Sequence, residues 1–171
     1  VRAPVRVSGL RGRLSMARLP RLALAGELHH LMQRGLVGQP VFGDDADRRD
    51  YLDMLRESAV QEGVAIHAYA LLDVEIHLLA TPAEAASLGR AMQSLGRRYV
   101  AAFNRRHGRR GTLWDGRFLA SAVETPALLM DATVFVETRP VAAGLVASAG
   151  DWSWSSAAHH LGRRRDSLLA D

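Results

Sequence analysis

A β-hairpin in the middle of the sequence restricts the possible folds more than any other segment. Residues 64–72 are rich in β-branched and apolar side chains, and residues 75–80 resume that pattern after a break at Asp73-Val74. Two such runs joined by so short a connection are typical of antiparallel strands. Helix-type segments lie on both sides of the hairpin, so we expect a mixed α+β domain.

The two helix-type segments have clear start and stop signals. Asp44-Asp45 is an N-cap signal, and apolar residues then recur at helical spacing until Gly63. Pro82 stands at the expected first turn of a second, longer helix, which runs to Gly108. The apolar stripes of the two helices are Tyr51, Leu52, Leu55 and Ala59 in the first, and Ala85, Leu88, Met92, Leu95, Tyr99 and Phe103 in the second.

The remaining segments complete a recognisable order. Residues 22–33 alternate in part and predict a strand, residues 35–43 a loop, and residues 117–124 another strand. Thr125-Pro126 caps a last helix over residues 127–138, which Pro140 terminates. We therefore predict a ferredoxin-like antiparallel sheet with helices on one face and an added C-terminal helix.

The 171 residues are enough for one compact domain. Val1 suggests a GTG codon and Met16 a later start, so we interpret residues 1–15 as a disordered extension. Residues 16–162 then form the domain and residues 163–171 a basic tail. Cysteine is absent, which excludes disulfides and fits the reducing cytoplasm of a prokaryotic cell. No apolar run approaches the roughly 20 residues of a membrane span.

Positive charge is concentrated in one stretch. All 22 basic residues are arginine, and the formal net charge is +4. Residues 97–117 contain Asp115 as their one acid, and Trp114 in this stretch predicts either base stacking or core packing. The pattern favours phosphate contacts with nucleic acid over a merely solvated helix face. The arginines of this connector are Arg97, Arg98, Arg105, Arg106, Arg109, Arg110 and Arg117.

Residues 16–162 resemble the REP-associated tyrosine transposases of the HUH endonuclease superfamily almost from end to end. The resemblance rests on five pieces in the right order. They are Gln33-Arg34-Gly35 with Gln39-Pro40-Val41-Phe42, Asp44-Asp45-Ala46-Asp47-Arg48, residues 99–118, residues 140–146, and Asp151-Trp152-Ser153-Trp154-Ser155-Ser156.

The resemblance implies a specific activity. Such proteins cut single-stranded DNA beside a hairpin, and a tyrosine on the C-terminal helix becomes linked to the DNA phosphate. Two histidines flanking one hydrophobic residue on a strand hold a divalent metal. An Asn or Gln four positions after the tyrosine is the third ligand. The active unit is typically a homodimer.

This sequence departs from that pattern at most of the implied positions. The paired ligand positions correspond to Glu75 and His77, and the nucleophile position to Phe135. The third ligand position corresponds to Arg139, counting back from Pro140. Phenylalanine has no oxygen to attack phosphorus, and arginine offers a metal no lone pair. None of the tyrosines lies on the last helix.

Two consequences follow for the site. Glu75 and His77 alone make a poor site for Mg²⁺ or Mn²⁺, so we expect no cofactor unless the site still functions. Arg139 would instead supply positive charge, and we predict an ion pair with Glu75. The adjacent pairs His29-His30 and His159-His160 are assigned no role, since neighbours on a strand point to opposite faces.

Three functional hypotheses remain open. The first is a transposase-like protein that binds single-stranded or hairpin DNA and has lost its nuclease and strand-transfer activity. The second is an active tyrosine transposase with an atypical site. The third is a decayed gene product or an interaction module that no longer binds DNA.

Overall fold

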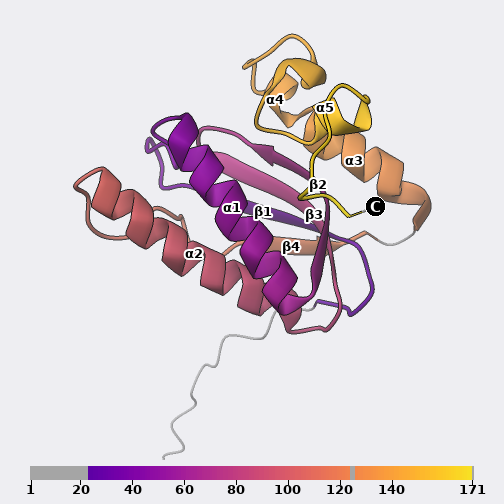
Figure 1. The fold of residues 1–171 in the computed structure, drawn as a ribbon, viewed down its shortest axis with the longest axis horizontal. Helices are drawn as coiled ribbons and strands as arrows, with labels where there is room; N and C mark the ends of the chain where they lie inside the picture. The colour runs from indigo at the N-terminus through magenta and orange to yellow at the C-terminus, as the bar shows by residue number, and fades with distance from the viewer. Residues whose placement is uncertain (1–22, 124–125, 171) are drawn as a thin grey trace, which may run out of the picture.

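A four-stranded antiparallel sheet forms the centre of the computed structural model, which describes residues 23–123 and 126–170 (Figure 1). Its strand order is β2-β3-β1-β4, and every neighbouring pair is antiparallel. The predicted hairpin is confirmed as β2 and β3. The strands are β1 (His29–Arg34), β2 (Val64–Leu71), β3 (Glu75–Pro82) and β4 (Leu119–Ala122).

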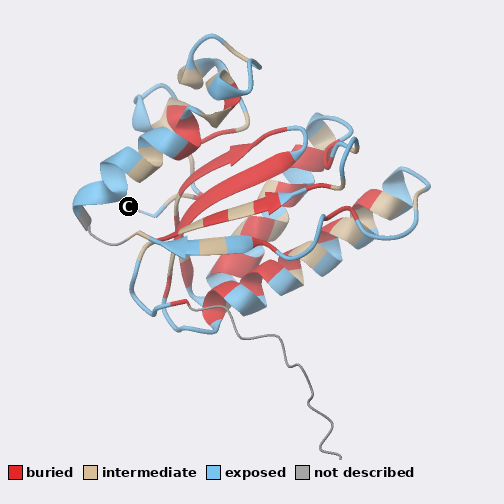
Figure 2. Ribbon diagram, turned by 180° about the vertical axis from the view of Figure 1, so that it is seen from behind, coloured by how far each residue is buried: buried red, intermediate tan, exposed pale blue. Residues whose placement is uncertain are grey.

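Two long helices cover one face of this sheet, and the helix over residues 129–137, α3, lies on the other face (Figures 1 and 2). Neighbouring residues of a strand face opposite ways, so Ile76 and Leu78 join the core beneath the long helices, while Leu79 packs with Val136 of α3. The predicted ferredoxin-like α+β fold with an added C-terminal helix is confirmed. These helices are α1 (Asp45–Glu62), α2 (Ser87–Arg106) and α3 (Leu129–Glu137).

The ends of α1 follow the sequence signals. The Asp44 side chain accepts hydrogen bonds from the backbone N–H groups of Ala46 and Asp47, and the Asp47 carboxylate returns to the backbone of Asp44. This capping box satisfies N–H groups that have no partner inside the helix. Gly63 closes the helix with φ of 64°, a left-handed conformation that favours glycine.

Pro82 has a different position from that predicted, and Pro140, which follows the last long helix as predicted, begins a further short helix. Pro82 ends β3 opposite Val64, and α2 begins five residues later, at Ser87. A strand end tolerates a residue without an N–H group. Pro140 lies in the first turn of a separate short helix, α4 (Arg139–Ala142), where the missing N–H group also costs little. The last long helix ends before it, at Glu137.

Short helical turns make up most of the remaining structure. A 3-10 turn, η1 (Pro126–Leu128), precedes α3, and η2 (Ala149–Asp151) and α5 (Ala157–His160) follow α4. No helix in the described part of the chain is long and apolar enough to cross a membrane. The predicted extension, residues 1–15, lies outside the described residues.

Part of the predicted basic tail, residues 166–170, is packed against the sheet. Leu169 forms a parallel bridge with Ile66 of β2, and the Ala170 N–H group donates to the Ile66 carbonyl at 2.7 Å. Tyr69 Oη donates to the Asp166 carboxylate at 2.6 Å, and Leu168 is buried. The segment therefore extends the sheet beyond its β2 edge.

Candidate functional site

A chain of hydrogen bonds links two histidines and a glutamate on the α3 face of the sheet. His30 Nε2 lies 3.0 Å from His77 Nδ1, and His77 Nε2 lies 3.1 Å from Glu75 Oε1. A carboxylate only accepts, so the neutral His77 ring donates from Nε2 and accepts at Nδ1 from His30. All three side chains are buried or half-buried.

Strand geometry explains this grouping. Glu75 and His77 are two residues apart on β3, so they share a face as predicted. His30 comes from β1, where the antiparallel register places Met32 opposite His77 and Leu79 opposite His30. Sequence reasoning gave His30 no role. His29 points to the other face of the sheet, as expected for a neighbouring residue. His30 lies two residues before Met32, so it shares with Met32 the face that carries the site.

Two arginines neutralise the charge of Glu75. Arg139 Nη2 lies 3.3 Å from Glu75 Oε1, which confirms the predicted ion pair. Arg34, which sequence reasoning missed, lies opposite Glu75 in the sheet and contacts Oε2 at 3.1 Å. Although burial raises the pKa of Glu75, hydrogen bonds from His77, Arg34 and Arg139 bring that pKa below its usual value. The carboxylate is therefore charged at neutral pH.

Phe135 covers the histidines from α3. Its ring stands edge-on to His30 and His77, with centroid separations of 5.5 and 6.3 Å. The Arg139 guanidinium lies 5.4 Å from the Phe135 ring centroid, in cation–π contact. The phenyl ring therefore occupies the place from which a nucleophile on this helix would reach the site.

The residues present do not fit a divalent cation. Both ring nitrogens of His77 already have partners, and Glu75 is engaged by two guanidinium groups. A metal there would stand beside the positive charge of Arg139. Within residues 23–123 and 126–170, no group of three or more His, Cys, Asp or Glu is arranged to hold a metal.

Burial keeps both histidines neutral. The pKa of His30 is lowered from 6.5 to about 4, chiefly by burial and also by the neighbouring His77 and Arg139. The pKa of His77 is also lowered by burial, despite its contact with Glu75. The site thus consists of a neutral histidine pair, one carboxylate and two guanidiniums.

The fold that carries this site is similar to the folds of solved structures. A REP-associated tyrosine transposase bound to a REP hairpin is similar over 91% of this chain and 92% of that chain, with a TM-score of 0.72 and 14% identity. This chain has the fold of a REP-associated tyrosine transposase. A candidate transposase from Deinococcus radiodurans overlaps less closely, with a TM-score of 0.47, 20% identity, and coverage of 71% and 97% respectively. No family model and no curated protein matches the sequence.

No tyrosine occupies the C-terminal helix of this transposase fold among the described residues. Tyr51 and Tyr99 lie in the core between α1 and α2, where Tyr99 Oη donates to the Val41 carbonyl at 2.6 Å. Tyr69 is held by Asp166 on the opposite side of β2 from α3. The buried phenols have raised pKa values, chiefly because of burial.

The connector of the transposase fold contains two kinds of arginine. Arg106 donates to Asp44 and Asp47 at 2.6 to 2.7 Å, Arg98 pairs with Glu57, and Arg109 donates to Gln39. These side chains stabilise the fold. The connector arginines that are exposed and make no ion pair within the described part of the chain are Arg97, Arg105, Arg110 and Arg117.

Trp114 is a core residue, and the base-stacking role expected for it does not fit its position. It is 7% exposed and packs 6.2 Å from the Tyr99 ring. Gly35 pairs with it in an isolated bridge that ties the connector to the end of β1. The other prediction for this tryptophan, packing in the core, is confirmed.

Proposed function

We propose that this protein is a member of the REP-associated tyrosine transposase family that binds single-stranded or hairpin DNA without cleaving it. The single observation that carries the proposal is Phe135, which covers the histidine pair where the family has its tyrosine. The fold, shared over 91% of the chain with a transposase bound to a REP hairpin, supports the DNA partner. The exposed connector arginines supply the charge that phosphate contacts need.

The absence of an attacking oxygen at Phe135 removes the covalent step of the family's reaction, because a phosphotyrosine link requires a phenol oxygen. Arg139 and Arg34 hold Glu75 in an ion-paired state. We infer that the site now has a structural role, in which a compact group of charges replaces the metal and its ligands.

The test uses hairpin DNA flanked by single strands, incubated with the protein and Mn²⁺. We expect retarded migration of the DNA, no cleaved strand and no covalent adduct after denaturation. An adduct or a nicked strand would instead identify an active transposase with an atypical site. If the protein does not retard the DNA even at low salt, it no longer binds DNA.

We further propose a homodimer, as in the active units of the family. Apolar side chains on the outer side of α3 support it, since Met130 is 71% and Val134 51% exposed. Sedimentation velocity should give twice the monomer mass, and Met130→Glu should shift the equilibrium towards monomer. A protein that sediments as a monomer at micromolar concentration would contradict this proposal.

A further inference from the structure

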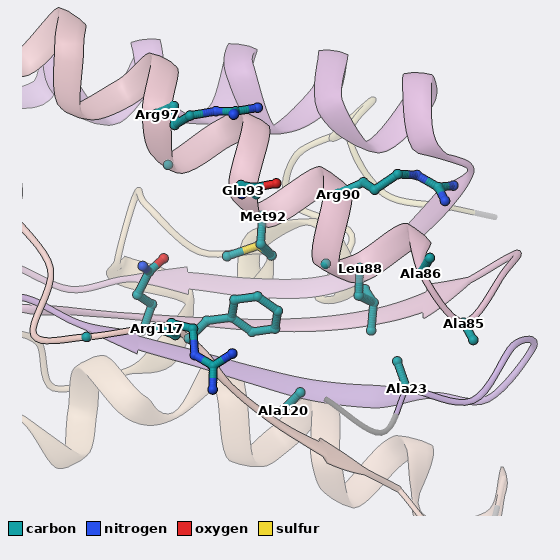
Figure 3. Close-up of a pocket in the computed structure, with 15 residues that line it drawn as sticks. Ala23, Ala85, Ala86, Leu88, Arg90, Met92, Gln93, Arg97, Arg117 and Ala120 are labelled. Atoms are coloured by element: carbon teal, nitrogen blue, oxygen red, sulfur yellow. The ribbon is translucent and has the colours of Figure 1, made fainter. Parts of the chain in front are cut away.

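A hollow of about 740 Å³ lies between α2 and the strands β1 and β4, on the opposite face of the sheet from His77 (Figure 3). Leu88 and Met92 extend from α2 into it, while Arg117 and Ala120 line it from the other side. Its volume is within the range of cavities that hold small ligands. The histidine pair and its ion-paired glutamate lie on the other face of the sheet and do not account for it.

Two glycines keep the helix side of this groove open. Gly89 and Gly96 are seven residues apart on α2, so both lie on its groove-facing side. A Cβ atom at Gly89 would meet no other atom within 4 Å. Glycine inside a helix lowers its stability relative to alanine, and core packing does not require it at Gly89.

Gln33 provides an unused hydrogen-bonding group in the groove. Its residue is 8% exposed, it lines the cavity, and its side-chain amide makes no hydrogen bond with any residue the structure describes. The amide atoms are not fully buried, so a ligand in the groove can reach them. The arrangement therefore suits a ligand that presents both a donor and an acceptor to Gln33.

The rim of the groove selects for negative charge. Arg97 from α2 and Arg117 from the connector both line it, and neither makes an ion pair within residues 23–123 and 126–170. Arg90, at the other end, is already paired with Glu62 and Glu84. The two free guanidiniums suit phosphate oxygens beside the apolar floor.

We propose that this groove binds an unpaired nucleotide of single-stranded DNA. The base lies against Met92 and Phe118, which both line the groove, its polar edge meets the Gln33 amide, and the phosphates on either side of the nucleotide contact Arg97 and Arg117. Only an unpaired base offers both a flat apolar face and a free hydrogen-bonding edge. The proposal rests on the DNA-binding function above, but it concerns a surface separate from the histidine pair.

The test compares one hairpin DNA with a single-stranded tail and the same hairpin with a blunt end. Gly89→Leu fills the groove with a good helix-forming residue, and Gln33→Leu removes the amide. Gln61→Leu, on the exposed side of α1, is the matched control because it adds the same side chain outside the groove. Each variant is first checked for wild-type secondary structure and melting temperature.

We expect Gly89→Leu and Gln33→Leu to weaken binding of the tailed hairpin about tenfold, a size typical of losing one stacked base. Binding of the blunt hairpin and the behaviour of Gln61→Leu should not change. If folded Gly89→Leu binds the tailed hairpin like the wild type, the groove proposal is wrong and DNA binding stands. If the wild type binds neither DNA, the proposed function itself fails.

A second measurement needs no substitution. A tail that contains 5-iodouracil is bound to the wild-type protein and irradiated, and the attached peptide is identified by mass spectrometry. We expect attachment to the peptides that contain Met92 or Phe118. Attachment confined to peptides outside the groove would overturn the proposal even if the variants lose affinity.

Discussion

Arg139 and Glu75 lie 64 positions apart in the sequence, yet their charged groups are 3.3 Å apart on the α3 face of the sheet. The pair joins the start of α4 to the start of β3. Arg34 contacts the same carboxylate, so one negative charge is paired with two guanidinium cations. This asymmetry decides how the site responds to substitution.

Glu75→Gln should destabilise the domain more than Arg139→Met does. The first change leaves two guanidiniums facing a neutral amide, whereas the second leaves Glu75 with Arg34 and His77. We expect losses of about 2 kcal/mol and about 1 kcal/mol, reduced by the partial exposure of both arginines. Urea denaturation of the two variants and of the double variant measures this. Equal losses would show that Arg34 contributes nothing.

Mn²⁺ should not bind specifically at His77. Its ring nitrogens are engaged by His30 and Glu75, and Arg139 repels a cation. Isothermal calorimetry at millimolar Mn²⁺ should give only dilution heats, in the wild type and in His77→Ala alike. A one-site isotherm that disappears in His77→Ala would refute this expectation.

Restoring the family's residues should restore chemistry only in combination. Phe135→Tyr alone supplies an oxygen beside a site that does not fit a metal, so we expect no covalent product. Adding Glu75→His and Arg139→Asn removes the ion pair and supplies metal ligands, and this triple variant should form a DNA adduct with Mn²⁺. The matched control keeps Phe135 and carries the other two changes. An adduct with that control would implicate a different nucleophile.

Connector arginines should differ in their effect on salt dependence. Each phosphate contact contributes about 0.7 to the log–log slope of binding to single strands, so Arg105→Gln with Arg110→Gln should lower the slope by about 1.4. Arg106→Gln should mainly lower stability, because Arg106 holds Asp44 and Asp47. Fluorescence anisotropy over a salt series separates the two effects. An unchanged slope in the double variant would mean that these arginines do not contact phosphate.

Mild acid should destabilise the domain through His30. Its pKa is about 4 when folded and near 6.5 when unfolded, so the unfolded chain takes up the proton first. Stability is therefore complete above about pH 6.5 and decreases as the pH falls towards 4. Glu75 loses its contribution only below its usual pKa of 4.5, so measurements between pH 5 and 6.5 isolate the histidines.

NMR titration of the His30 ring checks this assignment, and urea midpoints measured at pH 7 and pH 5 check its effect on stability. His30→Leu should reduce the difference between those midpoints. A His30 ring that titrates near 6.5 in the folded protein would show that burial does not control its pKa.

Local signals in the sequence predicted local structure well. Asp44 and Gly63 limit α1 because a capping carboxylate and a left-handed residue act within a few positions of themselves. Glu75 and His77 were predicted to share a face for the same reason, since strand alternation needs no partner. Pro82 was placed wrongly because a proline suits a helix start and a strand end equally.

Features that depend on distant pairing were missed. His30 and Arg34 reach the site only through the register between β1 and β3, which no local pattern specifies. For Trp114 the sequence left base stacking and core packing both open, and only the folding of the connector back onto α2 decides for the core. Arg139 was predicted correctly since the resemblance supplied the long-range alignment that periodicity lacks.

The pairing of Leu169 with Ile66 has a consequence for biosynthesis. Translation proceeds from the N-terminus, so β2 emerges from the ribosome long before residues 166–170 do. Residues 154–156 cover the Tyr69–Leu71 part of the outer edge, but the part at Ile66 stays open to pairing with any other extended chain until residues 166–170 are made, and such pairing is how aggregation begins. A nascent chain stalled before residue 166 should therefore depend on chaperones more than the released protein.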